Sequence, residues 1–229
     1  MNGQRRISFV RNQYRDDGER DFGATLRELK QQGCVLLITG AVARSVTLQA
    51  IRRLSGDPCC DRKHVLVATR TTTADIDGGL PPGVKREDPN VRVITPTDVG
   101  TDASAERDEG RTELEYIRAE LLRAVGHFDH SASGLSPAEL RVSIDSLERL
   151  LETNDRAAVT RFLRTVMALI RGVKGIGHVH LPVPDDSSEV ARLSPLFDAR
   201  IELRRRDPLV AEQRWHLPMG NTDTRWTKL

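Results

Sequence analysis

A continuous apolar run bounded by two glycines limits the folds open to this chain more than any other feature. The run covers residues 34–39, between Gly33 and Gly40, and has the length and composition of a strand buried on both faces. After it, apolar residues recur at helical spacing over 45–54, before Gly56 interrupts the pattern. The sequence therefore predicts a buried strand, a glycine turn and a helix, in that order.

Residues 40–47 occupy the frame of a phosphate-binding loop, G-x-x-x-x-G-K-[ST]. In that frame backbone N–H groups surround the phosphates, the lysine reaches the β and γ phosphates, and the hydroxyl meets Mg²⁺. Gly40 and Thr47 match the frame, but Ser45 stands at the second glycine and Val46 at the lysine. We interpret the turn as part of a vestigial nucleotide site, whose predicted residues are Gly40, Ala41, Arg44, Ser45, Val46, Thr47 and Asp145.

Further strands alternate with helices along the rest of the chain. The predicted strands cover 64–69, 91–95, 139–145 and 178–183. The predicted helices are a short amphipathic one around 22–29, one over 114–125 that ends at Gly126, and one from an N-cap at Asn154 to Gly172. Residues 199–206 and 212–217, joined at Asp207 and Pro208, predict a C-terminal hairpin at the sheet edge. Together they indicate a three-layer α/β fold, with a mostly parallel sheet and helices on both faces.

The polar segment 1–21 is expected to be flexible, and 22–229 to form a single domain. Residues 70–90 are expected to form a loop, and the acidic, glycine-bearing stretch 97–110 a mobile surface loop. No apolar stretch is long enough to span a membrane, and the N-terminus lacks the apolar core of a signal peptide. A cytoplasmic location is the default expectation.

Asp145 follows the apolar strand predicted over 139–145. Proteins that hydrolyse nucleotides with a phosphate loop hold Mg²⁺ through an acid at the end of a separate apolar strand. The alternative is a residue that caps the following turn, and Asp145 alone does not separate the two. Because Asp145 comes after the turn at 40–47, we favour descent from a Mg²⁺-binding aspartate.

The segment Arg-Val-Ser-Ile-Asp-Ser at 141–146 resembles the second nucleotide motif of the KaiC family, and the segment 198–217 resembles that family's terminal strands. The chain thus resembles the RecA/KaiC class of P-loop ATPase domains. Segments 22–40, 53–57, 197–199 and 213–217 are similar to a haloarchaeal family known as halobacterial-transducer-like (HTR-like). This resemblance covers residues 22–229 and implies a degenerate RecA/KaiC-type domain.

The same resemblance argues against ATP hydrolysis. In the RecA/KaiC pattern a glutamate pair at the end of the second strand polarises the attacking water, whereas Thr69, Arg70 and Thr71 stand there. A positioned charge such as the missing lysine is worth several kcal/mol of transition-state stabilisation. We therefore expect a non-catalytic protein, with no catalytic residue and no resident cofactor.

Binding of a nucleotide without hydrolysis stays open as the alternative. The backbone of 40–45, Thr47, Asp145 and the helix N-terminus could hold an anion, so weak ATP and Mg²⁺ binding is not excluded. Arg44 either replaces the missing cation or is a solvent-exposed arginine, which is the simpler interpretation.

Histidine and cysteine residues do not predict a metal site. His178 and His180 lie on one strand, and His127 and His130 lie near a helix end, but neither pair has a carboxylate or cysteine at ligand spacing. The three cysteines form no disulfide framework or spaced zinc ligand set.

The formal charge of +2 arises from interspersed acids and bases, so nucleic-acid binding is not demanded. Four arginines in 200–206 indicate the solvated face of a strand; as an alternative they could form a nucleic-acid surface, and they are Arg200, Arg204, Arg205 and Arg206. The leading hypothesis is a regulatory or protein-interaction module, in signal transduction if it follows its family. A protein partner is expected, and assembly into homo-oligomers is left open.

Overall fold

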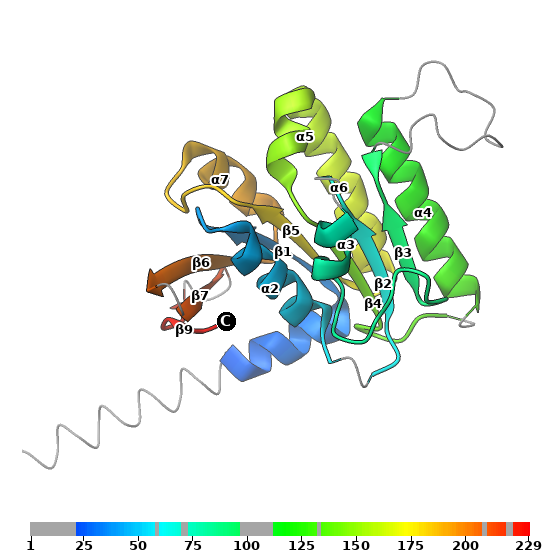
Figure 1. Cartoon of the computed structure of the whole chain (residues 1–229), viewed down its shortest axis with the longest axis horizontal. Coiled ribbons are helices and arrows are strands. Elements are labelled where there is room, and N and C mark those ends of the chain that lie inside the picture. Colours follow the sequence, from blue (N-terminus) through cyan, green and yellow to red (C-terminus); the bar gives the residue numbers. More distant parts are fainter. Residues whose placement is uncertain are drawn as a thin grey trace, which may run out of the picture.

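The computed structural model describes residues 22–57, 60–69, 73–96, 112–131, 134–207, 210–218 and 222–229. In these residues helices cover both faces of one central sheet (Figure 1). They are a first helix over 22–32, then α2 (Arg44–Ser55), α3 (Thr73–Gly79), α4 (Glu113–Ser131), α5 (Leu147–Thr153), α6 (Arg156–Gly172) and α7 (Ser188–Leu193), with a 3-10 turn, η2, at Ser194–Leu196.

The sheet contains nine strands in the described residues. They are β1 (Cys34–Thr39), β2 (Lys63–Val67), β3 (Val91–Ile94), β4 (Leu140–Ile144), β5 (Ile176–Leu181), β6 (Ala199–Asp207), β7 (Val210–Leu217), β8 (Thr222–Asp223) and β9 (Thr227–Lys228). The order is β3-β2-β4-β5-β1-β6-β7-β8, and β9 also pairs with β7. Neighbours from β3 to β6 are parallel. The predicted α/β class with a largely parallel sheet is confirmed.

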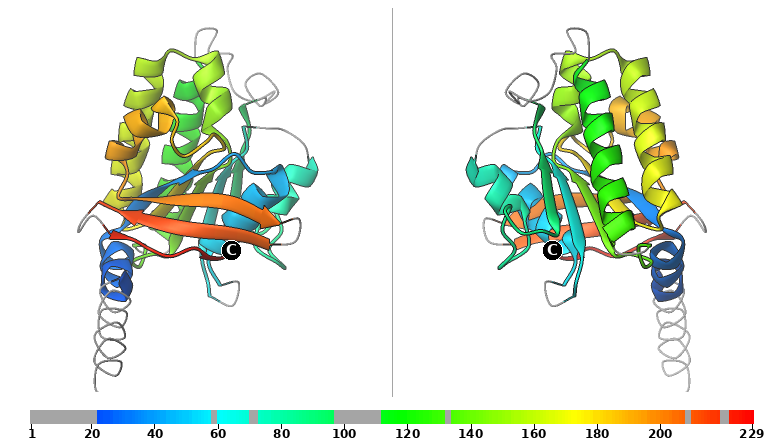
Figure 2. Two further views of the ribbon diagram at one scale, coloured as in Figure 1. Left: turned by 90° about the vertical axis from the view of Figure 1, so that its left-hand side faces the viewer. Right: turned by 90° about the vertical axis from the view of Figure 1, so that its right-hand side faces the viewer.

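Alternation of side chains along β1 explains why helices cover both faces. All six residues of β1 are buried. Val35 and Leu37 belong to the core cluster under α4, α5 and α6, whereas Leu36 and Ile38 belong to the cluster under α2. Successive residues of a strand point to opposite faces, so a continuous apolar run is what a strand between two helical layers requires. The two layers are visible on either side of the sheet in Figure 2.

The last strands pair in the opposite sense. β6 and β7 are antiparallel, with Glu202 opposite Arg214, and β8 and β9 extend the sheet beyond them. This pairing is compatible with the predicted C-terminal hairpin, whose turn includes Pro208, outside the described residues. Segments 1–21 and 97–110, for which we predicted flexibility, also lie outside them. Among the described helices, none has the length and apolarity needed to cross a membrane.

The prediction that Gly126 ends the fourth helix is wrong. α4 continues to Ser131 and buries Phe128, whose side chain is 2% exposed. A glycine within a helix costs about 1 kcal/mol relative to alanine, and burial of a phenylalanine side chain outweighs that cost at about 1.5–3 kcal/mol.

The predicted N-cap of α6 is also wrong by one residue. Asp155 caps this helix, and its side chain accepts hydrogen bonds from Ala157 N and Ala158 N. Asn154 instead follows α5, and its N–H donates to Leu150 O at 3.1 Å. α5 itself was not predicted; its buried residues, Leu147 and Leu150, belong to the main core cluster, and the helix contacts β5 and α6.

Part of the loop expected over 70–90 is helical. α3 occupies Thr73–Gly79, and Ile76 and Leu80 pack with Leu66 of β2 in a small apolar cluster. α3 covers the sheet on the same side as α2, near the β3 edge. It thereby shields the apolar side chains of this cluster from water.

Candidate functional site

Backbone hydrogen bonds hold the turn between β1 and α2, one within the turn and one to the segment after β5. Gly40 N donates to Val183 O at 2.9 Å, and Val42 N donates to Gly40 O at 2.8 Å. Gly40 has a φ of +118°, and a Cβ atom there would lie 2.1 Å from the carbonyl oxygen of Leu203 in β6. The close approach of β6 therefore requires a glycine here independently of any phosphate.

The end of the phosphate-loop frame lies in the first turn of α2. Val46 N and Thr47 N both donate to Ala43 O, at 2.9 and 3.3 Å. The side chain of Val46 is fully buried in the cluster under α2, and Thr47 is also buried, whereas Ala41 and Ser45 are exposed. A core side chain therefore occupies the position of the lysine, and two amides of the frame already have partners within the helix.

Arg44 and Asp145, 101 residues apart, form an ion pair. Arg44 Nη2 lies 2.6 Å from Asp145 Oδ2, with the two side chains 27% and 2% exposed. Arg44 Nη1 also donates to the backbone oxygen of Asp145 at 3.3 Å. The simpler interpretation of Arg44, as a solvent-exposed arginine, is therefore wrong, because its guanidinium is engaged at the end of β4.

The second oxygen of Asp145 binds the end of the neighbouring strand. Thr69 N donates to Asp145 Oδ1 at 2.7 Å, and the Thr69 hydroxyl lies 2.7 Å from the same oxygen. These bonds cross to the segment after β2, rather than reaching the first turn of α5, so Asp145 does not act as a cap for that turn. Both carboxylate oxygens therefore have partners, and a metal ion bound there would lie next to the positive charge of Arg44. Arg70 and Thr71 lie outside the described residues.

Buried histidines lie between α2 and the sheet. His178 Nδ1 and His180 Nε2 are 3.0 Å apart, so one ring donates to the other. Burial lowers the pKa of His178 to about 3 and holds that of His180 well below its usual value. His64 of β2 is also buried, which lowers its pKa to about 4. These rings are neutral at pH 7 and form part of the core.

His127 and His130 lie apart from that group. Both are exposed near the end of α4, where His127 Nε2 is 3.1 Å from a guanidinium nitrogen of Arg92. The two histidine pairs of the sequence thus belong to separate regions, one in the core and one on the surface.

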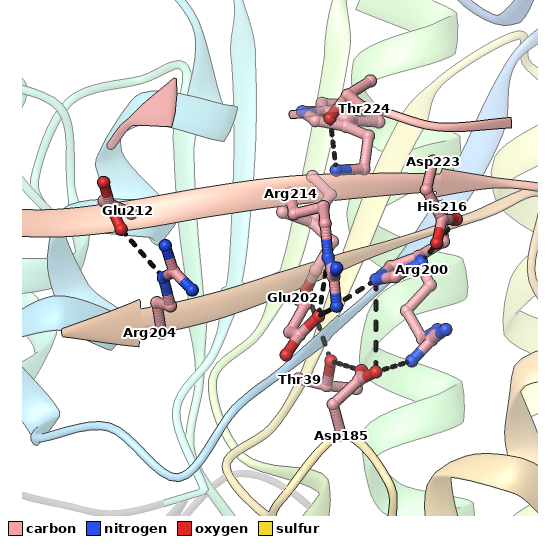
Figure 3. Close-up of polar contacts among 12 residues, drawn as sticks. Thr39, Asp185, Arg200, Glu202, Arg204, Glu212, Arg214, His216, Asp223 and Thr224 are labelled. Carbon is pink, nitrogen blue, oxygen red and sulfur yellow. Dashed lines mark hydrogen bonds and ion pairs between the residues drawn. The ribbon is translucent and has the colours of Figure 1, made fainter. Parts of the chain in front are cut away.

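Sequence reasoning missed a polar network around the ends of β1, β6 and β7 (Figure 3). Thr39 Oγ1 donates to Asp185 Oδ1 at 2.5 Å, and Arg200 forms an ion pair with the other oxygen of Asp185. Glu202 accepts from Arg214 Nε at 3.0 Å. These contacts join β1, the segment after β5, and the antiparallel pair.

His216 completes this network. Its Nε2 lies 3.2 Å from Glu202 Oε2, and its Nδ1 lies 2.7 Å from Asp223 Oδ1. Ligand atoms of Asp185, Glu202 and His216 lie within 4.8 Å of one another. Arg200 and Arg214 form ion pairs with these two carboxylates, so the network joins the strands through paired charges. The alternation of charged residues along β6 and β7 was the only sequence signal for it.

The arginines of 200–206 divide into two groups. Arg200 pairs with Asp185, and Arg204 donates to Glu212 Oε2 at 2.8 Å while its guanidinium lies 3.8 Å above the Trp226 ring. Arg205 and Arg206 are exposed. Burial alternates along β6 up to Leu203, as the sequence predicted, but Arg200 and Glu202 on the outer face are only partly exposed because both form ion pairs.

Comparison with known proteins identifies a family, but that family has no assigned function. Among curated proteins, none matches this chain. The sequence profile of one family matches residues 33–203, which include β1, the turn, α2, Asp145 and most of β6. By that match the chain belongs to the family of unknown function DUF7504.

Proposed function

We propose that this chain is a non-catalytic RecA/KaiC-like module that acts in regulation through contacts with a protein partner. The strand order supports this proposal, because β1 and β4 are separated only by β5 and end at the same edge of the sheet. Gly40 follows β1 and Asp145 follows β4 at this edge. In open α/β sheets the carboxyl ends of strands are where ligands bind.

The Arg44–Asp145 ion pair carries the proposal. A nucleotide site of this type needs an acid free to hold Mg²⁺ and a cation free to meet phosphate. Here Asp145 and Arg44 neutralise each other at 2.6 Å. The buried Val46 replaces the lysine, so the residues of the former site stabilise the fold rather than a ligand.

A regulatory role follows from the combination of a retained fold and a closed site. A domain that neither holds nor hydrolyses nucleotide would act through its surface, and we propose signal transduction as its setting on the HTR-like resemblance alone. Fold by itself does not specify the partner, so the partner is identified by capture from the native host.

The alternative is a nucleotide-binding protein with an atypical loop. It is favoured by the position of Arg44, which begins α2 and is 27% exposed. If Arg44 turned from Asp145 to a phosphate group, one movement would supply a cation and free an acid. That movement must break a short ion pair, so we rank this alternative second.

Calorimetric titration with Mg-ATP separates the two proposals. We expect no saturable heat for the unaltered chain and for Arg44→Ala, because the latter loses the cation while Val46 stays in the core. Saturable binding to the unaltered chain that Arg44→Ala abolishes would support the atypical nucleotide site and contradict the closed one. Arg164→Ala, which changes an exposed residue of α6, is the matched control.

A further inference from the structure

A cavity of about 1090 Å³ lies at the amino ends of the central strands, away from Asp145. It reaches Cys34 and Ile176, the first residues of β1 and β5, and the first helix and β7 also line it. Small-molecule sites have typical volumes of about 300–1,000 Å³, so the cavity can hold an organic ligand. Its apolar wall includes Phe22, Leu26, Leu29, Leu54, Ile176 and Trp215.

Arg141 of β4 lines this cavity as a buried cation. Its side chain is 7% exposed, and its Nε has no hydrogen-bond partner. No carboxylate of the described residues forms an ion pair with it, and the ionisable group beside it at the start of β1 is the thiol of Cys34. Burial raises the pKa of Cys34 to about 12, so this thiol is neutral and leaves Arg141 uncompensated.

A buried cation without a counter-charge is unfavourable by several kcal/mol. Burial, with repulsion from Arg62, lowers the pKa of Arg141 to about 10, so the guanidinium is still charged at pH 7. Arg62 lines the same cavity, and its Nε also lacks a partner. Two guanidinium groups that repel each other beside an apolar cavity provide the electrostatic environment for a bound anion.

The other charged residues of the wall add to this excess. Lys30, Arg53 and Arg225 line the cavity, against two acids, Asp57 and Asp223. Asp223 is already bonded to His216. The wall is therefore cationic as well as apolar.

We propose that this cavity binds an amphipathic organic carboxylate, whose anionic head pairs with Arg141 and whose hydrocarbon body lies against the apolar wall. The planar guanidinium fork matches the two oxygens of a carboxylate. A single negative charge compensates Arg141, and the apolar side chains exclude water from the rest of the ligand. The site is independent of the nucleotide question, because Arg44 and Asp145 lie at the opposite ends of the strands.

Titration of the full chain with dodecanoate, below its micelle concentration, tests the proposal. We expect saturable binding of one molecule, at least about tenfold tighter than that of dodecyltrimethylammonium, which has the same tail and a cationic head. Arg141→Met keeps an extended side chain without the charge, and should weaken dodecanoate binding about tenfold or more. Without ligand, this variant should be at least as resistant to urea as the unaltered chain, because it removes an uncompensated charge.

Arg164→Met, on the exposed face of α6, is the matched control and should bind dodecanoate as the unaltered chain does. Arg62→Met provides a second test if Arg141→Met does not fold, and should also weaken dodecanoate binding. Failure of the unaltered chain to bind dodecanoate would overturn the proposal. Equal affinity for the two amphiphiles, or full affinity in Arg141→Met, would also overturn it. None of these results depends on whether Mg-ATP binds.

Discussion

Arg44 and Asp145 form an ion pair of 2.6 Å that joins the first turn of α2 to the end of β4. Asp145 is 2% exposed, so its charge is removed from water and depends on Arg44 and on the bonds from Thr69. The same two residues were predicted from the sequence as members of a vestigial nucleotide site. In the structure they stabilise each other, which makes the pair a structural element of the fold.

The energetic coupling of this pair can be measured directly. Arg44→Ala leaves Asp145 buried without its counter-charge and should lower the free energy of unfolding by about 3 kcal/mol. The double variant Arg44→Ala/Asp145→Ala should lose less than the sum of the single variants, by about 0.5–3 kcal/mol. Urea unfolding of the four proteins of this cycle gives the coupling, and strictly additive losses would show that the pair contributes nothing.

Restoring the phosphate-loop residues should not restore nucleotide binding. Val46→Lys places an ammonium group in the core, because Val46 is fully buried beneath α2, and a buried unpaired charge costs several kcal/mol. We expect this variant to be strongly destabilised in urea and to show no saturable heat with Mg-ATP. Ser45→Lys, one residue earlier at an exposed position, is the matched control and should unfold like the unaltered chain. A stable Val46→Lys variant that binds ATP would contradict this account.

A comparison of alanine substitutions at Gly40 and Gly83 distinguishes the cost of steric crowding from the cost of the backbone conformation. Both have positive φ, but a Cβ on Gly40 would lie 2.1 Å from Leu203 O, whereas a Cβ on Gly83 would have nothing within 4 Å. Gly83→Ala should cost about 1–2 kcal/mol for its backbone conformation alone. Gly40→Ala should cost clearly more, since β6 must also move. Equal shifts in the urea unfolding midpoint would argue against the close approach of β6.

The buried histidines should make the fold sensitive to mild acid. Burial lowers the folded-state pKa values of His64 and His178 to about 4 and about 3, below the usual histidine value of 6.5. Below pH 6.5 the unfolded chain therefore binds more protons than the folded one, so stability falls as the pH falls toward these values. Each histidine should contribute about 1.4 kcal/mol per pH unit in that window.

Urea unfolding between pH 7 and pH 5 measures this slope. His64→Asn should reduce the slope of the unfolding free energy against pH by the contribution of one histidine, because it removes one of the buried rings. His130→Asn, which changes an exposed side chain of α4, should leave it unchanged. An identical slope in the unaltered chain and His64→Asn would show that His64 does not take up a proton on unfolding in this window.

Much of the fold could be predicted because its signals are local. The apolar run of β1 and the helical spacing of α2 each depend on a few consecutive residues, and the structure places both within a residue of the prediction. The errors arose where packing overrides local preference. α4 continues beyond Gly126 because Phe128 is buried in the core. Asp155, rather than Asn154, is the N-cap of α6, because Asn154 is the C-cap of α5.

The candidate site was predicted less completely, because its contacts join distant parts of the chain. Motif spacing identified Arg44 and Asp145 as members of one site, but not that they neutralise each other across 101 residues. The network of Asp185 and His216 depends on the register between β6 and β7, which a single sequence does not specify. The sequence gives no sign that Arg141 is buried, because its burial depends on the elements that pack around it.

Measurement of ATP turnover tests the central claim, that the Arg44–Asp145 ion pair closes the nucleotide site predicted from the sequence. Purified protein with Mg²⁺ and ATP should release phosphate no faster than the buffer does, and Asp145→Ala should give the same rate. Turnover above the buffer rate that Asp145→Ala abolishes would contradict the claim, because it would show that Asp145 supports catalysis.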